Sequence, residues 1–454
     1  MARPSDISVL RAEFKTAPLP YRAPLKFGGR IVAGAEILNV RIEVESCGGG
    51  RATGFGSMPL GNVWAWPSAK LEPDVTAKAI RTLSERITTA AGTWPGYAHP
   101  LDIVAELHGQ YARLARDVEQ DLELAEPIPE LAILLAASPV DAALHDGFGR
   151  ANGINSFNGL GPDYVEKDLS HRLDMSFDGE HLDRYVAAAP KERMPLYHLI
   201  GALDPLEDAD VASRINDSLP ETLREWVPFN GLTHLKIKLN GDDLAWDVAR
   251  VVAIEKTCAS AQKERGCGEW NYSCDFNEKC RDVEYVLEFL AKVKLQAPTA
   301  WDRIQYLEQP THRDLKAHPE NRMHRAAAIK PVVIDESLVD YESLLLARDQ
   351  GYSGVALKAC KGHSEALLMG AAAQKFGMFL CVQDLTCPGA SFLHSAELAA
   401  RIPTVAAIEG NARQFCPAGN VGWEEKYPGM FRITDGSVRT GTLVELGLGH
   451  SPPE

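Results

Sequence analysis

The chain of 454 residues is acidic: its formal charge at pH 7 is −15, with 45% hydrophobic and 24% charged residues. This charge argues against nucleic acid or an anionic membrane surface as a partner, because both recruit clustered Lys and Arg. The N-terminus has no apolar signal segment, and no later run approaches the roughly 20 apolar residues that span a bilayer. Nine cysteines spread over so long a chain fit reduced thiols. We therefore expect a cytoplasmic globular protein, large enough for a barrel-sized domain and a second, smaller one.

The first third of the chain predicts strands followed by helices. Apolar and polar residues alternate from 38 to 45, as in a half-exposed antiparallel strand, and the glycines at 48–50 indicate a turn. Charged and apolar residues then repeat at helical spacing over 73–90 and 105–125, and a further helix is predicted over 131–146. This order is typical of an α+β domain rather than of a βαβ repeat.

Two tryptophans, Trp64 and Trp66, lie in an otherwise irregular stretch from 58 to 67. Loop tryptophans either cap a core or line a ligand cleft, and the pattern does not decide between the two. We keep both residues as candidate substrate contacts. The charged segment 178–193 predicts the end of this first domain, which we assign to residues 1–190.

From Pro195 onward, short apolar runs alternate with amphipathic helices. Most neighbouring runs start roughly 20–35 residues apart, the length of one strand-plus-helix unit, and they number about eight. This rhythm predicts a (β/α) barrel over residues 191–410. The tail, residues 411–454, lacks the rhythm and is expected to pack back on the first domain. The predicted strands are 196–200, 235–239, 272–275, 304–308, 332–335, 354–358, 378–383 and 405–408.

The second of these strands carries two lysines on one face. In a β-strand Lys236 and Lys238 point the same way as His234, whereas Leu235 and Ile237 point the opposite way. Buried lysines are rare unless they are paired, so the strand is either a solvated edge strand or a barrel strand with a chemical role. Taken alone, the pattern favours the edge strand, and the strands that follow must decide.

Acidic residues close three successive strands. Asp275, Glu308 and Asp335 stand at the ends of their runs, and Lys358 ends the next one. In a (β/α) barrel the C-terminal ends of the strands deliver side chains to one pocket. Three converging carboxylates would repel one another, whereas Mg²⁺ would relieve the repulsion and keep coordination positions for a substrate. Any one of these acids could instead pair with a helix N-terminus, but the ordered set predicts a metal site.

These motifs resemble, in order, the strand-end motifs of the enolase superfamily. The chain is most similar to the muconate lactonizing enzyme subgroup of the mandelate racemase/muconate lactonizing enzyme family, and residues 140–146 with Gly153 resemble the helix that closes that family's capping domain. The resemblance covers nearly the whole chain and implies an α/β fold, a modified TIM (β/α) barrel with an N-terminal α+β capping domain. The motifs are Lys-Ile-Lys (236–238), Cys-Asp-Phe-Asn (274–277), Tyr-Leu-Glu-Gln-Pro (306–310), Ile-Asp-Glu-Ser (334–337) and Ala-Leu-Lys (356–358).

The resemblance also implies roles for the strand-end residues. Three carboxylates, those of Asp275, Glu308 and Asp335, would bind Mg²⁺. Two lysines, Lys238 and Lys358, would face each other across the α-carbon of the substrate. A lysine serves as a base at neutral pH only if its pKa is lowered, and a nearby divalent cation together with another ammonium lowers it.

Lys236 would lie near the substrate carboxylate. There, together with the metal, it would neutralise the enediolate that forms when the α-proton leaves. Glu336 alternates away from the ligand face, so we expect it to support a ligand from behind or to form a salt bridge. Asn277 either orients a metal ligand or caps the next helix, and the cap is the commoner role for Asn.

Three further residues are candidate substrate contacts. Gln383 and Asp384 follow the seventh strand, and the pattern does not say which faces inward. His198 lies on the first strand, where an isolated histidine is more often a satisfied core group than a specificity residue. No histidine stands at the end of the seventh strand. This absence weakens the interpretation as an acid-sugar dehydratase, which would use a histidine acid there.

A lysine on each face of the α-carbon predicts racemisation or epimerisation of a small-molecule carboxylate, because one lysine can remove the proton and the other can return it. The same pair permits cycloisomerisation. The alternative within enzymes is a lyase, such as an acid-sugar dehydratase or another β-eliminating enzyme. The alternative from another class is a catalytically silent binding or scaffold barrel, which the complete set of three acids and three lysines argues against. A homo-oligomer is implied by the resemblance alone.

Overall fold

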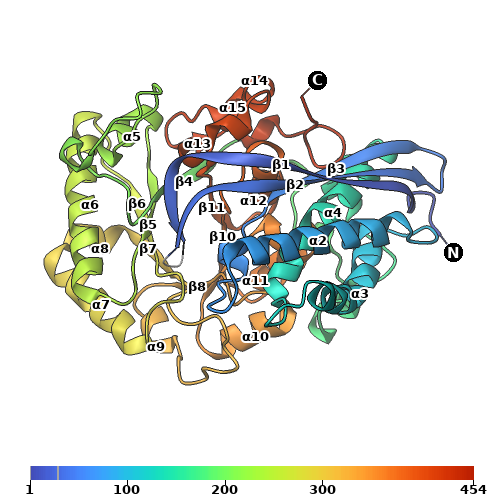
Figure 1. The fold of residues 1–454 in the computed structure, drawn as a ribbon, viewed down its shortest axis with the longest axis horizontal. Coiled ribbons are helices and arrows are strands. Elements are labelled where there is room, and N and C mark those ends of the chain that lie inside the picture. The colour runs from blue at the N-terminus through green and yellow to red at the C-terminus, as the bar shows by residue number, and fades with distance from the viewer. Residues whose placement is uncertain (1, 28–29, 454) are drawn as a thin grey trace.

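The computed structural model describes residues 2–27 and 30–453. These residues form a barrel of parallel strands enclosed by helices and, beside it, an antiparallel sheet covered by its own helices (Figure 1). This arrangement confirms the predicted α/β class, a modified TIM barrel with an N-terminal α+β capping domain.

Three antiparallel strands build the N-terminal sheet, in the order β1 (Ile7–Phe27), β2 (Arg30–Ser46) and β3 (Arg51–Pro59). The predicted strand at 38–45 is the central part of β2. Helix α4 (Glu130–Ala151) packs so closely on this sheet that a Cβ on Gly56 would lie 1.8 Å from the carbonyl oxygen of Pro139. The side chains of β2 that face α4 and the core are Leu38, Val40, Ile42 and Val44.

The helices of this domain largely follow the predicted ranges. Helix α3 begins before the predicted position 105 and ends before 125, because Pro100 suits the first turn of a helix and the His99 side chain accepts a hydrogen bond from the N–H of Leu101. The short helix α1 was not predicted. The helices are α1 (Asn62–Ala65), α2 (Pro73–Gly92), α3 (Pro100–Asp121) and α4 (Glu130–Ala151), and four 3-10 turns follow at η1 (Ser156–Gly159), η2 (Leu169–His171), η3 (Met175–Phe177) and η4 (Leu182–Arg184).

Helix α4 is the central helix of the capping domain. By length and apolar composition it is the one helix within residues 2–27 and 30–453 that could cross a bilayer, contrary to the expectation that no run comes close. The whole of that apolar stretch is buried inside the protein. Its composition is therefore that of a core helix.

Eight parallel strands form the barrel, which is closed by the pairing of its first strand with its last. Each observed strand begins and ends within two residues of the predicted run, as the alternation of the sequence requires. The strands are β4 (Met194–Ile200), β5 (His234–Lys238), β6 (Asn271–Asp275), β7 (Ile304–Glu308), β8 (Val332–Ile334), β9 (Gly354–Leu357), β10 (Phe379–Val382) and β11 (Val405–Glu409).

The two faces of the barrel strands bury different side chains. Leu235 and Ile237 of β5 belong to the large core between strands and helices, whereas Lys236 points into the barrel. A small separate core of six side chains, which includes Tyr197 and Tyr306, fills the barrel interior. The surrounding helices are α5 (Leu223–Asn230), α6 (Leu244–Glu264), α7 (Val283–Gln296), α8 (Pro298–Arg303), α9 (His324–Ala327), α10 (Tyr341–Asp349), α11 (His363–Lys375) and α12 (Gly389–Arg401), with 3-10 turns η5 (Asp208–Asp210) and η6 (Ala359–Lys361).

The C-terminal segment contacts both domains. Strand β12 (Ser437–Val438) pairs antiparallel with β4. Farther along, the backbone N–H of Leu448 donates to Asp146 of α4, and the N–H of Ser156 donates to the carbonyl of Gly447. The elements of this segment are α13 (Ala412–Phe415), η7 (Pro417–Asn420), α14 (Trp423–Lys426), α15 (Pro428–Phe431), β12 (Ser437–Val438) and η8 (Thr440–Thr442).

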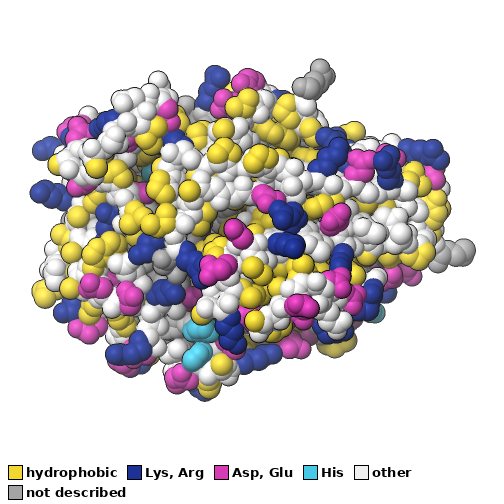
Figure 2. Space-filling model, in the orientation of Figure 1, with side chains coloured by type: hydrophobic (Ala, Val, Ile, Leu, Met, Phe, Trp, Pro, Cys, Tyr) yellow, Lys and Arg dark blue, Asp and Glu magenta, His cyan; other side chains and the backbone are white. Residues whose placement is uncertain are grey.

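Contacts at several places hold the capping domain over the barrel, among them the arm of β1 and β2 and helix α4. The long arm of β1 and β2 reaches across the barrel (Figure 1), where Leu25 packs against Leu199 and Phe415. From α4, Asp141 accepts hydrogen bonds from the N–H and the Oγ of Ser364 at the start of α11, both at 2.8 Å. On the face shown in Figure 2, acidic and basic side chains are interspersed over both domains.

Candidate active site

The carboxylates of Asp275, Glu308 and Asp335 end three neighbouring barrel strands. Asp275 of β6 is directly paired with Glu308 of β7, and Asp335 follows the last residue of β8. All three side chains are almost completely buried. Oε2 of Glu308 accepts no hydrogen bond from the described part of the chain, and Oδ1 of Asp335 accepts none either, although the ammonium of Lys361 lies 3.3 Å from it. A buried anionic oxygen without a hydrogen-bond donor is costly, which indicates a site that a cation completes.

Lys236 lies on the floor of this site. Its Nζ donates to Glu308 (2.7 Å), to Gln383 (2.6 Å) and to Glu409 (3.0 Å), and it lies 3.0 Å from Oδ2 of Asp275. Burial disfavours the ammonium, but the surrounding carboxylates outweigh burial and raise the pKa of Lys236 well above its usual value. The ammonium therefore stays charged and occupies the space between the acids.

Lys238 and Lys358 lie on opposite walls of the barrel. Lys238 ends β5 and Lys358 follows β9, and these strands are four places apart in a closed ring of eight. Lys238 donates to Asp275 (2.5 Å) and to Asn277 (2.9 Å). Lys358 lies 2.9 Å from Oδ2 of Asp335 and donates to a backbone carbonyl. Each lysine is thus tied to one of the candidate metal ligands.

The acids and lysines shift one another's pKa values. Burial, with the neighbouring carboxylate of Asp275, raises the pKa of Glu308 well above its usual range. Burial also acts on Asp275, but Lys236 and Lys238 outweigh it and lower the pKa of that carboxyl. For Lys358, burial is likewise outweighed by the carboxylates, so its pKa is raised. The site is held together by compensating charges.

Sequence reasoning missed two charged members of the site. Lys361 of η6 donates to the carbonyl of Asp335 and lies 3.3 Å from its Oδ1, and burial lowers the pKa of Lys361. Glu409 closes β11 and binds Lys236. For Glu409 the signal existed, because it directly follows the predicted eighth strand, as acids close three of the others. Lys361 has no such signal, because its position in a 3-10 turn is not visible from periodicity.

Asn277 and Glu336 lie beside the lysines and are joined by a hydrogen bond. The Nδ2 of Asn277 donates to Oε1 of Glu336 at 3.2 Å, and its Oδ1 accepts from Lys238. The expected helix-cap role of Asn277 is wrong, because α7 begins at Val283 and the side chain of Asp282 caps it. Burial raises the pKa of Glu336 to about 7, with the charge of Asp335 adding to the effect.

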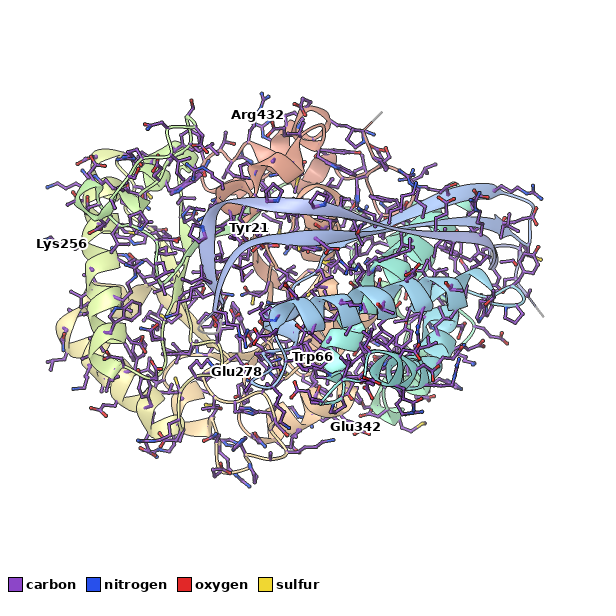
Figure 3. The ribbon with its side chains drawn as sticks, in the orientation of Figure 1. Tyr21, Trp66, Lys256, Glu278, Glu342 and Arg432 are labelled. Atoms are coloured by element: carbon purple, nitrogen blue, oxygen red, sulfur yellow. The ribbon has the colours of Figure 1, made fainter. Side chains whose placement is uncertain are left out.

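The two tryptophans have different surroundings. Trp64 lies in α1, its Nε1 donates to Glu336 at 3.0 Å, and the ammonium of Lys358 lies 4.3 Å from the centre of its ring. Trp66, labelled in Figure 3, donates to Glu126 instead and is buried in the hydrophobic core. The structure therefore places Trp64 at the site and Trp66 in the core beside it.

The remaining candidates also separate into two groups. Gln383 faces into the barrel, where it accepts from Lys236 and donates to Tyr306. Asp384 accepts hydrogen bonds from three backbone N–H groups and so holds the loop after β10 in place. His198 is buried and hydrogen-bonded to Arg413 and Gln414.

A comparison with protein families decides the assignment. The family model described as "Enolase C-terminal domain-like" matches residues 218–454, more than half of the chain. The chain belongs to the mandelate racemase/muconate lactonizing enzyme family of the enolase superfamily. The resemblance seen in the strand-end motifs is thereby confirmed. No curated protein sequence matches the chain.

Several solved structures share the fold of this family member. One is the substrate-liganded L-Ala-D/L-Glu epimerase from Bacillus subtilis (20% identity, 88% of this chain and 89% of that chain, TM-score 0.59). Another is a dipeptide epimerase from Enterococcus faecalis V583, complexed with Mg and L-Leu-L-Tyr (16%, 97% and 99%, 0.61). A third is the muconate lactonizing enzyme from Pseudomonas fluorescens complexed with muconolactone (17%, 98% and 96%, 0.60). At these identities the likeness shows the fold alone.

The carboxylates of this family member fit a hard divalent cation. Within residues 2–27 and 30–453, no group of three or more His, Cys, Asp or Glu side chains is arranged as a metal-coordination cluster. The contacts explain why, since the ammonium groups of Lys236 and Lys358 lie among the acids and take the place of a cation. Three buried carboxylates, two of them with an oxygen that accepts no hydrogen bond from the described residues, are the donors that Mg²⁺ prefers.

A cavity of about 180 Å³ opens beside Lys238. Three ammonium groups line it, those of Lys26, Lys238 and Lys279, together with several neutral residues and one acid, Asp242. Lys26 comes from the β1 arm of the capping domain, and its Nζ lies 3.4 Å from Oδ1 of Asn240. This excess of positive charge is local, because the chain as a whole is acidic. The cavity therefore favours an anionic ligand.

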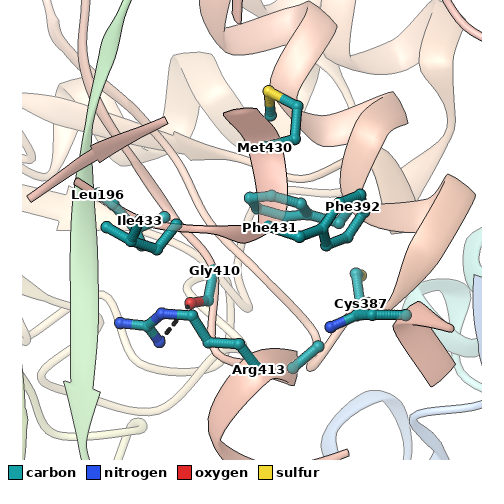
Figure 4. Close-up of a pocket in the computed structure, with 10 residues that line it drawn as sticks. Leu196, Cys387, Phe392, Gly410, Arg413, Met430, Phe431 and Ile433 are labelled. Carbon is teal, nitrogen blue, oxygen red and sulfur yellow. Dashed lines mark hydrogen bonds between the residues drawn. The ribbon is translucent and has the colours of Figure 1, made fainter. Parts of the chain in front are cut away.

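Two further cavities are lined by none of Lys236, Lys238 and Lys358. One of about 440 Å³ is lined by residues 22–24 of β1 together with His198, Ile200 and Trp226. The other has a volume of about 10 Å³ and lies beneath β4, between Leu196 and Phe392 (Figure 4). It has room for no more than about one water molecule, so it is a packing defect rather than a ligand site.

Proposed function

We propose that this protein is a Mg²⁺-dependent enzyme that removes the α-proton of a small-molecule carboxylate, as a racemase, an epimerase or a cycloisomerase. The observation that carries this proposal is the placement of Lys238 and Lys358 on opposite walls of the barrel, with the candidate metal ligands between them. A carboxylate substrate held at those ligands would present its α-carbon to a lysine on each side.

Asp275, Glu308 and Asp335 would hold the Mg²⁺. When bound, the cation supplies positive charge that stabilises the negative charge developing on the substrate carboxylate as the α-proton leaves. Lys238 and Lys358 now use two of these acids as partners. Once Asp335 binds a cation, it no longer raises the pKa of Lys358, so that lysine comes closer to the pKa that a base needs at neutral pH.

The side chains of the protein then divide the remaining work. Lys238 would accept the α-proton from one face and Lys358 would donate a proton to the other, which inverts the α-carbon. Lys236, fixed by Gln383 and Glu409, would keep a permanent positive charge beneath the substrate carboxylate. Trp64 covers Lys358 from the capping domain and would exclude water from that face.

The same lysine pair would support cycloisomerisation or β-elimination, in which one lysine acts as base or acid and the other is silent. The alternatives are therefore a lyase and, from another class, a binding or scaffold barrel without chemistry. The cavity lined by Lys26, Lys238 and Lys279 supports a carboxylate substrate in each case. A barrel without chemistry has no use for lysines on both walls, so we favour the enzyme.

Solvent deuterium exchange tests the proposal. The protein is incubated in D₂O with Mg²⁺ and a library of dipeptides, N-acyl amino acids and sugar acids, and α-deuteration is followed by mass spectrometry. We expect exchange with at least one class, and its loss at one face of the α-carbon in Lys238→Ala and at the other face in Lys358→Ala. Exchange that survives both substitutions would refute the two-lysine scheme. Dehydrated products would favour the lyase, and Mg²⁺ binding without exchange in any class would favour the scaffold.

A further inference from the structure

One carboxylate oxygen joins the surroundings of the two proposed bases. Oε1 of Glu336 accepts two hydrogen bonds, one from Nε1 of Trp64 at 3.0 Å and one from Nδ2 of Asn277 at 3.2 Å. Glu336 itself is only 3% exposed. The three residues come from the capping domain (α1), from the loop after β6 and from the loop after β8. They therefore meet only when both domains are in place.

Asn277 connects Glu336 to Lys238. The amide of Asn277 donates to Glu336 through Nδ2, so its Oδ1 points the other way and accepts from Nζ of Lys238 at 2.9 Å. Its backbone N–H donates to Asp275 at 2.8 Å. The backbone of Asn277 has a φ of +43°, a left-handed conformation that Asn tolerates better than most residues. Glu336 thereby selects which end of the amide faces Lys238.

Trp64 connects Glu336 to Lys358. The ammonium of Lys358 lies over the face of the indole ring, 4.3 Å from its centre, in a cation–π contact. A cation–π contact depends on the face of the ring, so the ring must not rotate. The hydrogen bond from Nε1 of Trp64 to Glu336 fixes that rotation. The same oxygen that orients Asn277 thus also orients the surface on which Lys358 rests.

We propose that Glu336 is a positioning residue for both proposed bases, acting on Lys238 through the Asn277 amide and on Lys358 through the Trp64 ring. This inference rests on the proposed function for its catalytic meaning, but the arrangement itself can be tested without a substrate. The proposal predicts which lysine each substitution should affect. Removing Asn277 should release Lys238 alone, removing the Trp64 donor should release Lys358 alone, and removing Glu336 should release both.

Competitive labelling of lysines by acetic anhydride, with the modified sites quantified by mass spectrometry, measures this release in the whole protein. We expect the labelling rate to rise about five-fold, the effect of one lost hydrogen bond, at Lys238 in Asn277→Ala and at Lys358 in Trp64→Phe. In Glu336→Ala both rates should rise. The Trp64→Phe variant keeps a ring face and loses only the donor, so it does not simply uncover Lys358.

Two controls separate positioning from loosening of the fold. Lys256 on the exposed side of α6 (Figure 3) should label at the same rate in every variant, and Glu336→Gln, which keeps an oxygen acceptor at this position, should restore both rates toward those of the wild type. Equal increases at Lys238 and Lys358 in all variants, or unchanged rates in Glu336→Ala, would overturn the inference.

The outcome is independent of the proposed function. The expected labelling pattern in a protein that exchanges no α-proton would keep the positioning role and refute only the chemistry. Conversely, exchange with a labelling pattern that does not separate the two lysines would keep the chemistry and refute the positioning role. Where exchange is found, enantiomers used singly should show that Asn277→Ala slows one face and Trp64→Phe slows the other.

Discussion

The ammonium of Lys236 and the carboxylate of Glu409 join two strands across an intervening one, with 3.0 Å between Nζ and Oε2. Lys236 lies on β5 and Glu409 ends β11, and β4 stands between these strands in the barrel. Lys236 also contacts Asp275 and Glu308. One buried lysine therefore balances three buried carboxylates.

Replacing this lysine should destabilise the metal-free protein strongly. In Lys236→Met three buried acids lose their common partner, and leaving buried charges unpaired costs about 3–5 kcal/mol of unfolding free energy. The measurement is urea unfolding in EDTA, with Lys256→Met as a matched control at an exposed lysine. Saturating Mg²⁺ should recover part of the loss, because the cation takes over two of the acids. An equal loss with and without Mg²⁺ would contradict the assignment of those acids as ligands.

Removing the metal should have a separate, reversible effect on the wild-type protein. Mg²⁺ at about 100 times its dissociation constant should stabilise the fold by about 2.7 kcal/mol, because it binds only the folded state. Thermal unfolding with and without Mg²⁺ measures this shift. Asp335→Asn, which removes one proposed ligand charge, should diminish the shift, whereas Asp349→Asn on the surface of α10 should leave it intact. A full shift in Asp335→Asn would remove Asp335 from the ligand set.

Lys26 and Lys279 should act on substrate binding rather than on chemistry. Lys26 and Lys279 line the cavity beside Lys238, and neither contacts a carboxylate among the residues that the structure describes. In Lys26→Met and Lys279→Met we expect KM to rise by about five-fold with little change in kcat, from an attraction of about 1 kcal/mol to an anionic substrate. Added salt should reduce the difference from the wild type. Unchanged KM at low salt in both variants would mean that the substrate enters elsewhere.

Glu365 should make stability fall as the pH rises. Burial raises the pKa of Glu365 to about 8, far above the usual value of a Glu in an unfolded chain. Below about pH 4 the side chain is protonated in both states; between about pH 5 and 8 only the unfolded chain loses the proton, so folding loses up to about 1.4 kcal/mol per pH unit. Glu365→Gln removes this pH-dependent loss of folding free energy.

Urea unfolding of both proteins at several pH values tests this sign. The unfolding free energy of Glu365→Gln should increase relative to that of the wild type as the pH rises from 5 to 8. A constant difference across that range would show that Glu365 is ionised in the folded protein.

The barrel was predictable from the sequence because its strands are short, apolar and evenly spaced, and because charged residues mark their ends. Lys236, Asp275 and Glu308 each end or nearly end a run whose limits alternation alone defines. The long β1 strand was not predicted. Its prolines and partly exposed residues hide the alternation, and much of it is ordered by pairing with β2.

The inner arrangement of the site was less accessible. Sequence order brings Asn277 next to a candidate ligand but says nothing of its partner, which lies 59 positions away at Glu336. The same holds for Trp64 and Lys358, whose contact depends on how two domains dock. Such pairings are set by packing between elements, whereas periodicity reports only the elements themselves.

The hydrogen bonds from Ser364 to Asp141 have a consequence for how this chain folds. Helix α11 has no side-chain cap of its own, and the turn before it carries Lys361 and follows Lys358. One of its first backbone donors, the N–H of Ser364, is satisfied by an aspartate that was synthesised more than two hundred residues earlier, in the N-terminal domain. A barrel expressed by itself would start this helix with a frayed end next to its second lysine. The two domains should therefore unfold in a single cooperative transition.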